Sequence, residues 1–232
     1  MDLISPIKNT KNLGEQAYET LRDSIITLKL EPGQNIYENE IATLLDISRT
    51  PIRDAFHSLI AEQLIEVLPQ RTKIVSRISE QKVKESAFIR MSLERSAFKL
   101  VASNWDQSNK YQKAERQIRR ILDEQEEALE AQDIDQFFQL HEAFHNSILQ
   151  LTGNETLLQF ISRVRGNLDR FRYLARREFV LTGHSVDEHR ELLTFLKNRD
   201  EQKVEQLVDH HMGELDEELA GLREKYPTYF TD

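Results

Sequence analysis

Two histidines one helical turn apart are the residues of this chain whose spacing most directly indicates chemistry. The stretch HEAFH, His141 to His145, has the pattern H-E-x-x-H. In metallopeptidases two histidines at this spacing bind zinc while the glutamate acts as a general base. The pattern alone does not distinguish a catalytic metal from a regulatory one. The distinction depends on which other residues are buried next to these two imidazoles.

Two further histidines lie on apolar helical faces. His141 and His145 fall within the apolar stripe of the segment 134–151, and His189 and His211 lie in the same way on later helical patterns. Side chains on such stripes point into the protein, where an imidazole without a partner costs free energy. A shared divalent metal would satisfy all four. The alternative is that each is a core histidine that forms a hydrogen bond with a nearby carbonyl or carboxylate.

The absence of cysteine restricts the metal. With no thiolate available, a transition metal must be held by His, Asp or Glu. Imidazole ligation suits zinc, nickel, cobalt, copper or iron, and zinc or nickel is the favoured cofactor. The remaining histidines, His57, His184 and His210, are not expected to be ligands.

The hypothesis of a zinc metallopeptidase is disfavoured, although it is kept as an alternative function. A catalytic zinc keeps one coordination position open. Two more inward histidines would crowd the ion, and no glycine follows His145 to continue the longer H-E-x-x-H-x-x-G-x-x-H form. We therefore expect that the protein is not an enzyme.

The length and composition indicate two domains in a soluble protein. The chain has 232 residues, enough for two cores. No apolar run approaches the roughly 18 to 20 residues of a membrane span, and the N-terminal MDLISPIKNTKNLGEQ lacks the apolar core of a signal peptide. We expect a cytoplasmic protein without membrane contact. The net charge of -9 gives no general attraction to nucleic acid, so DNA binding needs a local basic surface.

The pattern of the chain changes near Ser79. Residues 80–226 contain no proline and few glycines. Apolar residues recur there at helical spacing in six segments: 80–103, 109–131, 134–151, 155–178, 185–198 and 201–224. Residues 1–79 instead show three short helical patterns and two β-rich runs around a polar turn. The prediction is a mainly α protein, with a winged helix-turn-helix domain over 1–79 and an all-α antiparallel bundle of about six helices over 80–232.

The third helical pattern has the composition of a DNA-recognition helix. In DISRTPIRDAFHSLIAEQL, residues 46–64, Ser48 is a good N-cap and one face of the helix is apolar. The other face carries Arg49, Thr50, Arg53 and His57, and together with Ser48 these are the predicted DNA-binding residues of the helix. A short helix and a tight turn at Asp46 precede it, which completes a helix-turn-helix pattern.

The hairpin that follows adds two more basic residues. Arg71 and Lys73 lie at its tip, where a wing could contact phosphates or the minor groove. Taken singly, these charges could be ordinary solvated groups on a small domain. Their combination with a capped basic helix favours binding of a double-stranded DNA operator.

Both domains resemble a known family. Residues 14–75 resemble the winged-helix domain of GntR-type bacterial transcription regulators, and SRTPIRDAFHSLIAEQLIE is the most specific part. The resemblance implies that Arg49, Thr50 and Arg53 contact bases and phosphates. Asp46 and Thr72 stand where the turn and the wing of the family usually have glycine.

Residues 80–226 resemble the FCD effector domain of the FadR-like group, in which an Asp and three His bind metal beside a small-molecule pocket. The stretches HEAFHNSI, TGNETL and DEHRELLTFLKNRDEQKVEQLVDHH follow its pattern. The resemblance implies metal ligands at His141, His145, His189 and His211, with His141 in place of the usual Asp. A neutral ligand there leaves the site one charge more positive, which favours an anionic effector or a softer metal.

The resemblance also implies an effector site. The typical ligand is a small carboxylate that contacts the metal and arginines, and Arg90 matches an arginine of that pattern. The alternative for Arg90 is an i, i+4 salt bridge with Glu94 on the surface. The resulting hypothesis is a metabolite-responsive regulator that binds a pseudo-palindromic operator as a homodimer. A DNA-binding protein with a purely structural bundle is the other alternative.

Overall fold

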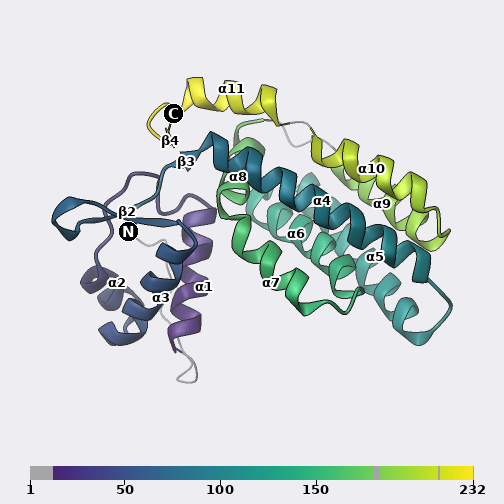
Figure 1. The fold of residues 1–232 in the computed structure, drawn as a ribbon, viewed down its shortest axis with the longest axis horizontal. Helices are drawn as coiled ribbons and strands as arrows, with labels where there is room; N and C mark the ends of the chain where they lie inside the picture. The colour runs from purple at the N-terminus through teal and green to yellow at the C-terminus, as the bar shows by residue number, and fades with distance from the viewer. Residues whose placement is uncertain (1–12, 180–182, 214, 232) are drawn as a thin grey trace. The chain divides into compact units, whose positions relative to one another are not determined.

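The computed structural model describes residues 13–179, 183–213 and 215–231. These residues form two compact units (Figure 1). The winged-helix unit comprises the described residues up to Val83, Arg163–Leu174, and those from Leu219 onward. The bundle unit comprises Lys84–Ser162 and the described part of Ala175–Glu218. Within the described residues, every helix is too short or too polar to cross a bilayer.

The winged-helix unit has the predicted three helices and hairpin. Its helices are α1 (Leu13–Ile26), α2 (Glu38–Leu45) and α3 (Arg49–Ala61). Strands β1 (Ile65–Val67) and β2 (Lys73–Val75) pair antiparallel, with Ile65 opposite Val75. Apolar side chains from all three helices are fully buried between them: Leu21, Ile25, Leu45, Ile52 and Leu59. This burial sets the polar face of α3 outward.

Two turns of this unit place non-glycine residues in the left-handed region. Asp46 ends α2 at φ 55° and ψ 44°, and its backbone N–H bonds to carbonyls of the last turn. Aspartate tolerates this conformation better than most residues. In the wing, Gln70 and Arg71 have φ 68° and 64°, whereas Thr72 lies at −65°. The left-handed residues of the wing, Gln70 and Arg71, therefore come just before Thr72, the position at which the family usually has glycine.

Among the described residues, six helices lie wholly or mostly in the bundle unit. They are α4 (Glu80–Asn104), α5 (Asn109–Glu130), α6 (Ile134–Gln150), α7 (Glu155–Val164), α9 (His184–Lys197) and α10 (Glu201–Gly213). The first residues of α4 and the last of α7 belong to the winged-helix unit. Their shared core includes Phe98, Ile118, Phe144, Ile148 and Leu196. The prediction of a mainly α chain with a helical bundle after the winged helix is confirmed.

Two of the six predicted helices are interrupted, and those two predictions were wrong in extent. The segment 155–178 contains α7 and a separate helix α8 (Gly166–Glu178). A Cβ on Gly166 would lie 2.9 Å from Cδ2 of Leu64, so this break uses the close approach that glycine permits. The segment 201–224 contains α10, which ends at Gly213, and α11 (Asp216–Lys225).

The boundaries of the two compact units do not follow a single division of the chain at Ser79. Residues 163–174, which include the first part of α8, group with the winged-helix unit. There Arg170 is fully buried, bonds to Oδ1 of Asn167 at 2.8 Å and donates to the Ser76 carbonyl. Burial lowers the pKa of Arg170 to about 10. The C-terminal strand β4 (Phe230–Thr231) pairs in parallel with β3 (Ile78–Ser79), a contact that the sequence did not indicate.

Candidate metal centre and DNA-binding surface

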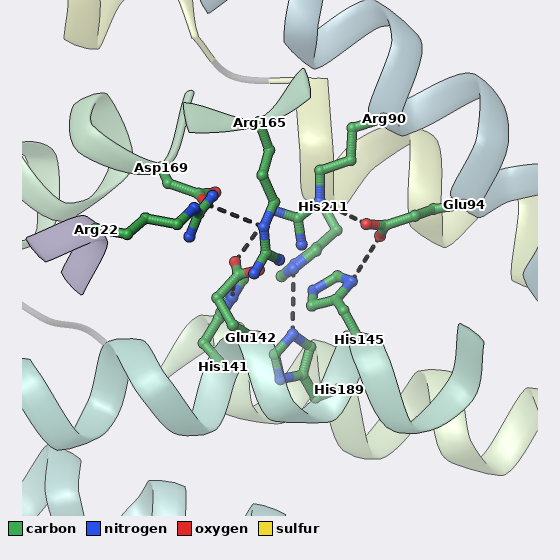
Figure 2. A network of polar contacts seen from close by, with 10 residues as sticks. All are labelled: Arg22, Arg90, Glu94, His141, Glu142, His145, Arg165, Asp169, His189 and His211. Atoms are coloured by element: carbon green, nitrogen blue, oxygen red, sulfur yellow. Dashed lines mark hydrogen bonds and ion pairs between the residues drawn. The ribbon is translucent and has the colours of Figure 1, made fainter. Parts of the chain in front are cut away.

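Four histidines meet inside the bundle unit (Figure 2). His141 and His145 come from successive turns of α6, His189 from α9 and His211 from α10. The first three are at most 1 % exposed. The six distances between ring centroids run from 4.8 to 5.5 Å, and one nitrogen from each ring lies within 4.8 Å of the others. The structure thus brings together all four predicted ligands.

Three of the rings are held by hydrogen bonds that their Nδ1 atoms donate. His145 Nδ1 lies 2.7 Å from Oε2 of Glu94, and His211 Nδ1 lies 2.6 Å from Oε2 of Glu188. Since a carboxylate only accepts, each of these Nδ1 atoms carries the hydrogen. His189 Nδ1 donates in the same way to Gln125 Oε1 at 3.0 Å. Neutral rings held like this present the Nε2 lone pair inward, as metal-bound histidines do.

One pair of inward nitrogens has the separation expected for two ligands of one metal ion, and the others lie within 4.8 Å. Nε2 of His189 and Nε2 of His211 are 3.2 Å apart. Tetrahedral zinc with bonds of about 2.0 Å places its ligand atoms about 3.3 Å apart. Among the described residues, Nε2 of His145 and both nitrogens of His141 have no hydrogen-bond partner. Buried polar atoms without partners cost free energy, so this donor set fits a divalent transition metal better than four separately satisfied core histidines.

The electrostatic environment favours the neutral form of three of these imidazoles. Burial lowers the pKa of His141 well below its ordinary value, and the charge of Arg176 adds to the effect. Burial likewise lowers the pKa values of His145 and His189. Neutral imidazole is the form that binds metal, so these three histidines are already in the form that accepts an ion.

Arg90 lies beside this cluster and is paired with two carboxylates. It is 1 % exposed, its Nε donates to Glu94 and its Nη1 donates to Oε1 of Glu142 at 3.0 Å. The i, i+4 pair with Glu94 that the sequence offered as an alternative is therefore present, but it is buried and not on the surface. Although burial opposes ionisation of Glu94, Arg90 and His145 lower the pKa of that carboxyl to about 2. The role of Arg90 in effector binding stays a prediction.

Glu142, the glutamate of HEAFH, is largely buried and accepts a hydrogen bond from Arg90. Its Oε1 is 3.5 Å from His141 Nδ1, at the edge of the cluster. A carboxylate oxygen that accepts a hydrogen bond from a buried arginine is already occupied and is poorly placed to take a proton from a metal-bound water. Its position suits charge balance around the histidines better than general-base catalysis.

Two residues of this centre were missed by sequence reasoning. Gln125 is fully buried on α5, and it lies on the same stripe as Leu122 and Ala128. A polar residue on an apolar stripe needs a buried partner, so this signal was available. Glu188 gave no such signal, because it stands in the charged stretch DEHRE, where a glutamate is ordinarily solvated.

The predicted DNA-binding residues lie mostly on one exposed face of the winged-helix unit. The exposed ones are Ser48, Arg49, Thr50, Arg53, His57 and Arg71, whereas Lys73 is half-buried. Ser48 occupies the N-cap position of α3, but its side chain makes no capping hydrogen bond there. Its hydroxyl is therefore available to another acceptor or donor. DNA contacts by these seven residues stay a prediction.

Glu38, at the start of α2, lies among these basic residues and was not singled out from the sequence. Its Oε1 accepts from Lys73 Nζ at 3.0 Å, and its Oε2 is 3.8 Å from Arg53 Nε. The hydrogen bond from Lys73, together with the charges of Lys73, Arg53 and Arg49, lowers the pKa of Glu38. Glu38 thus neutralises part of the positive charge that would otherwise attract a DNA phosphate.

We expect Glu38→Gln to strengthen DNA binding several-fold, because it removes a negative charge from the DNA-facing side and releases Lys73. Binding to a duplex selected from a random library would be measured by fluorescence anisotropy at two salt concentrations. The variant should also show a steeper loss of affinity with salt, since one more cation becomes available to phosphates. Glu40→Gln, at an exposed site on the same helix, is the charge-matched control. Weaker binding by the Glu38 variant alone would mean that Glu38 itself supports the contact.

Comparisons with known proteins agree for both units. Residues 85–214 match the family model "FCD domain", and residues 13–75 match "Bacterial regulatory proteins, gntR family". The "HTH-type transcriptional repressor RspR" of Escherichia coli (strain K12) is 27 % identical over 232 residues, which cover 100 % of both chains. The "Probable D-xylose utilization operon transcriptional repressor" of Paenarthrobacter nicotinovorans is 26 % identical, over 92 % of this chain and 91 % of its own.

Solved structures show the same fold. E. coli McbR/YncC superposes with a TM-score of 0.78 at 20 % identity, covering 92 % of this chain and 98 % of its own. A putative GntR transcriptional regulator from Rhodococcus sp. RHA1 gives a TM-score of 0.72 at 19 % identity, covering 90 % and 97 %.

These relatives are transcription regulators, which confirms the prediction that the protein is not an enzyme. The FCD model alone covers more than half of the chain. The protein belongs to the FCD-containing regulators of the bacterial GntR family, and it is a transcription regulator with an N-terminal helix-turn-helix domain.

Proposed function

We propose that this regulator binds a pseudo-palindromic operator as a homodimer and responds to a small carboxylate through a metal site in its bundle unit. The observation that carries the proposal is the convergence of four histidines, three of them buried and His211 partly buried. The rings of His145, His189 and His211 are held with Nε2 inward. A purely structural bundle would gain more stability from apolar residues at these positions, because burying polar groups is costly.

The donor set supports zinc or nickel as the resident metal, with His141, His145, His189 and His211 as ligands. When bound, a divalent ion would supply positive charge and one or two open coordination positions. Glu94, Gln125 and Glu188 orient the rings that they contact. Because these three residues fix three of the four rings, most of the site is organised before any metal or effector arrives.

The charges around the histidines support an anionic effector. Arg90 and Arg176 lie near the histidines together with the carboxylates of Glu94, Glu142 and Glu188, and a bound divalent ion would add two positive charges there. We infer that an incoming carboxylate takes the place of Glu142 at Nη1 of Arg90, while Arg90 keeps its bond to Glu94.

A thermal unfolding assay with a panel of small carboxylates tests the effector class. Metal-loaded protein should unfold at a temperature that rises with carboxylate concentration, since a ligand at 100 times its Kd adds about 2.7 kcal/mol. Glu142→Gln should bind the same carboxylate more tightly, because the neutral amide competes less well for Arg90. Asp135→Asn, an acidic-to-amide change elsewhere on α6, is the matched control.

Stabilisation by a neutral or aromatic compound, with no response to any anion, would contradict the carboxylate assignment. Weaker carboxylate binding by Glu142→Gln than by the parent would show that Glu142 supports the ligand and does not compete with it.

The homodimer follows from how the helix-turn-helix reads DNA. One recognition helix contacts only a few base pairs in the major groove, and two-fold symmetry doubles the length of the site. In this proposal the exposed residues of α3 read each half-site, and Arg71 at the wing contacts the adjoining backbone.

A further inference from the structure

A second group of possible metal ligands lies on the surface of the bundle unit. His184 Nε2 is 3.2 Å from Oε1 of Glu188, and His210 Nε2 is 3.6 Å from the same oxygen. The donor atoms of all three residues lie within 4.8 Å of one another. The side chains of His184 and His210 are 67 % and 58 % exposed, so an ion can reach them from solvent.

We propose that His184, Glu188 and His210 form a second, solvent-facing site for a divalent transition metal such as Zn²⁺. Two imidazoles and a carboxylate are a common zinc ligand set, with water completing the coordination. The separations of 3.2 and 3.6 Å bracket the value of about 3.3 Å expected between ligands of tetrahedral zinc. The site is separate from the four-histidine centre and shares no ligand with it.

The backbone holds these three side chains at the required spacing. His184 and Glu188 are four residues apart on α9 and therefore lie on one face of that helix. His210 comes from α10, which follows α9 after a connection of three residues. A short connection makes the two helices neighbours, so the third ligand does not depend on a long loop.

A hydrogen bond from His211 positions Glu188 for this role. Its Oε2 accepts a hydrogen bond from His211 Nδ1 at 2.6 Å, which leaves Oε1 directed at His184 and His210. One carboxylate thus faces the partly buried His211 on one side and two exposed histidines on the other. Carboxylates that orient a metal-bound histidine are common, but here the same group would also bind a second ion.

The surface site should bind metal more weakly than the buried one. Its two histidines have exposed side chains that lose rotamer freedom when they bind an ion. It also lacks the low-dielectric surroundings and fixed rings of the four-histidine centre. Zn²⁺ added to metal-free protein should therefore bind in two steps, first at the buried centre and then at the surface.

Zinc titration of tag-free, full-length protein in the presence of a chromophoric chelator tests the proposal. The parent should show two binding events of different affinity. The double variant His184→Ala/His210→Ala should lose the weaker event and keep the tight one, which also reports that the variant is folded. His57→Ala, which removes an exposed histidine from the winged-helix unit, should keep both events.

A weaker event that persists in the double variant, or that is absent from the parent, would overturn the surface site. The buried centre is tested separately, because His141→Ala should lose the tight event and retain the weaker one. Loss of the weaker event in His141→Ala, with the tight event intact, would contradict the assignment of both sites.

Discussion

Arg49→Ala and Arg53→Ala should each weaken binding to a library-selected operator by about ten- to a hundredfold, the cost expected for a base-contacting arginine. Both side chains are exposed at the N-terminal end of α3, where a recognition helix meets base edges. The apolar face of α3 is unaffected, since Ile52 and Phe56 remain buried. A mobility-shift titration at fixed salt measures the loss, while metal content and dimerisation should be unchanged.

The matched control is Arg120→Ala, which removes an exposed arginine from α5 in the bundle unit. If that control lost as much affinity, the effect of the α3 variants would be one of general charge. Unchanged affinity in both α3 variants would remove α3 as the recognition helix. Loss of affinity for every duplex alike, with a shallower salt dependence, would make these arginines phosphate contacts and not base contacts.

Periodic features of the sequence predicted most of the fold. The three helices and hairpin of the winged-helix unit were confirmed because capping, turn and apolar signals coincide within short stretches of chain. The pairing of Ile78 with Phe230 could not be predicted, since strands of two residues have no alternation to read and their partners lie far apart. The break at Gly166 depends on the approach of Leu64, which is a tertiary contact.

The candidate metal centre was partly predictable for a similar reason. The stripes on α6, α9 and α10 indicated that four histidines point inward, and the structure brings them together. Periodicity does not say which charged residue stands behind a ring, so Glu188 was not found. It also did not reveal that Arg90 is buried with Glu94 and Glu142, because an i, i+4 pair has the same spacing on the surface and in the core.

The second large effect concerns the buried centre, where replacing any one of the four histidines by alanine should lower metal affinity by more than about a hundredfold. Loss of an orienting residue alone typically costs about ten- to a hundredfold, and loss of a ligand should exceed that. Elemental analysis after exchange against a weak chelator should find about one metal per chain in the parent, and much less in each variant.

Glu142→Gln is the control that answers the question raised by HEAFH. Its carboxylate is bonded to Arg90 and lies beside the His141 ring without a hydrogen bond to it, so removing its charge should leave metal content nearly unchanged. In a peptidase the same change would abolish hydrolysis. Full metal content after loss of both His189 and His211, together with peptide hydrolysis that disappears in Glu142→Gln, would contradict the regulatory centre. If metal is lost on removal of each histidine but kept in Glu142→Gln, the two histidines of the motif are metal ligands and its glutamate is not needed to hold the metal.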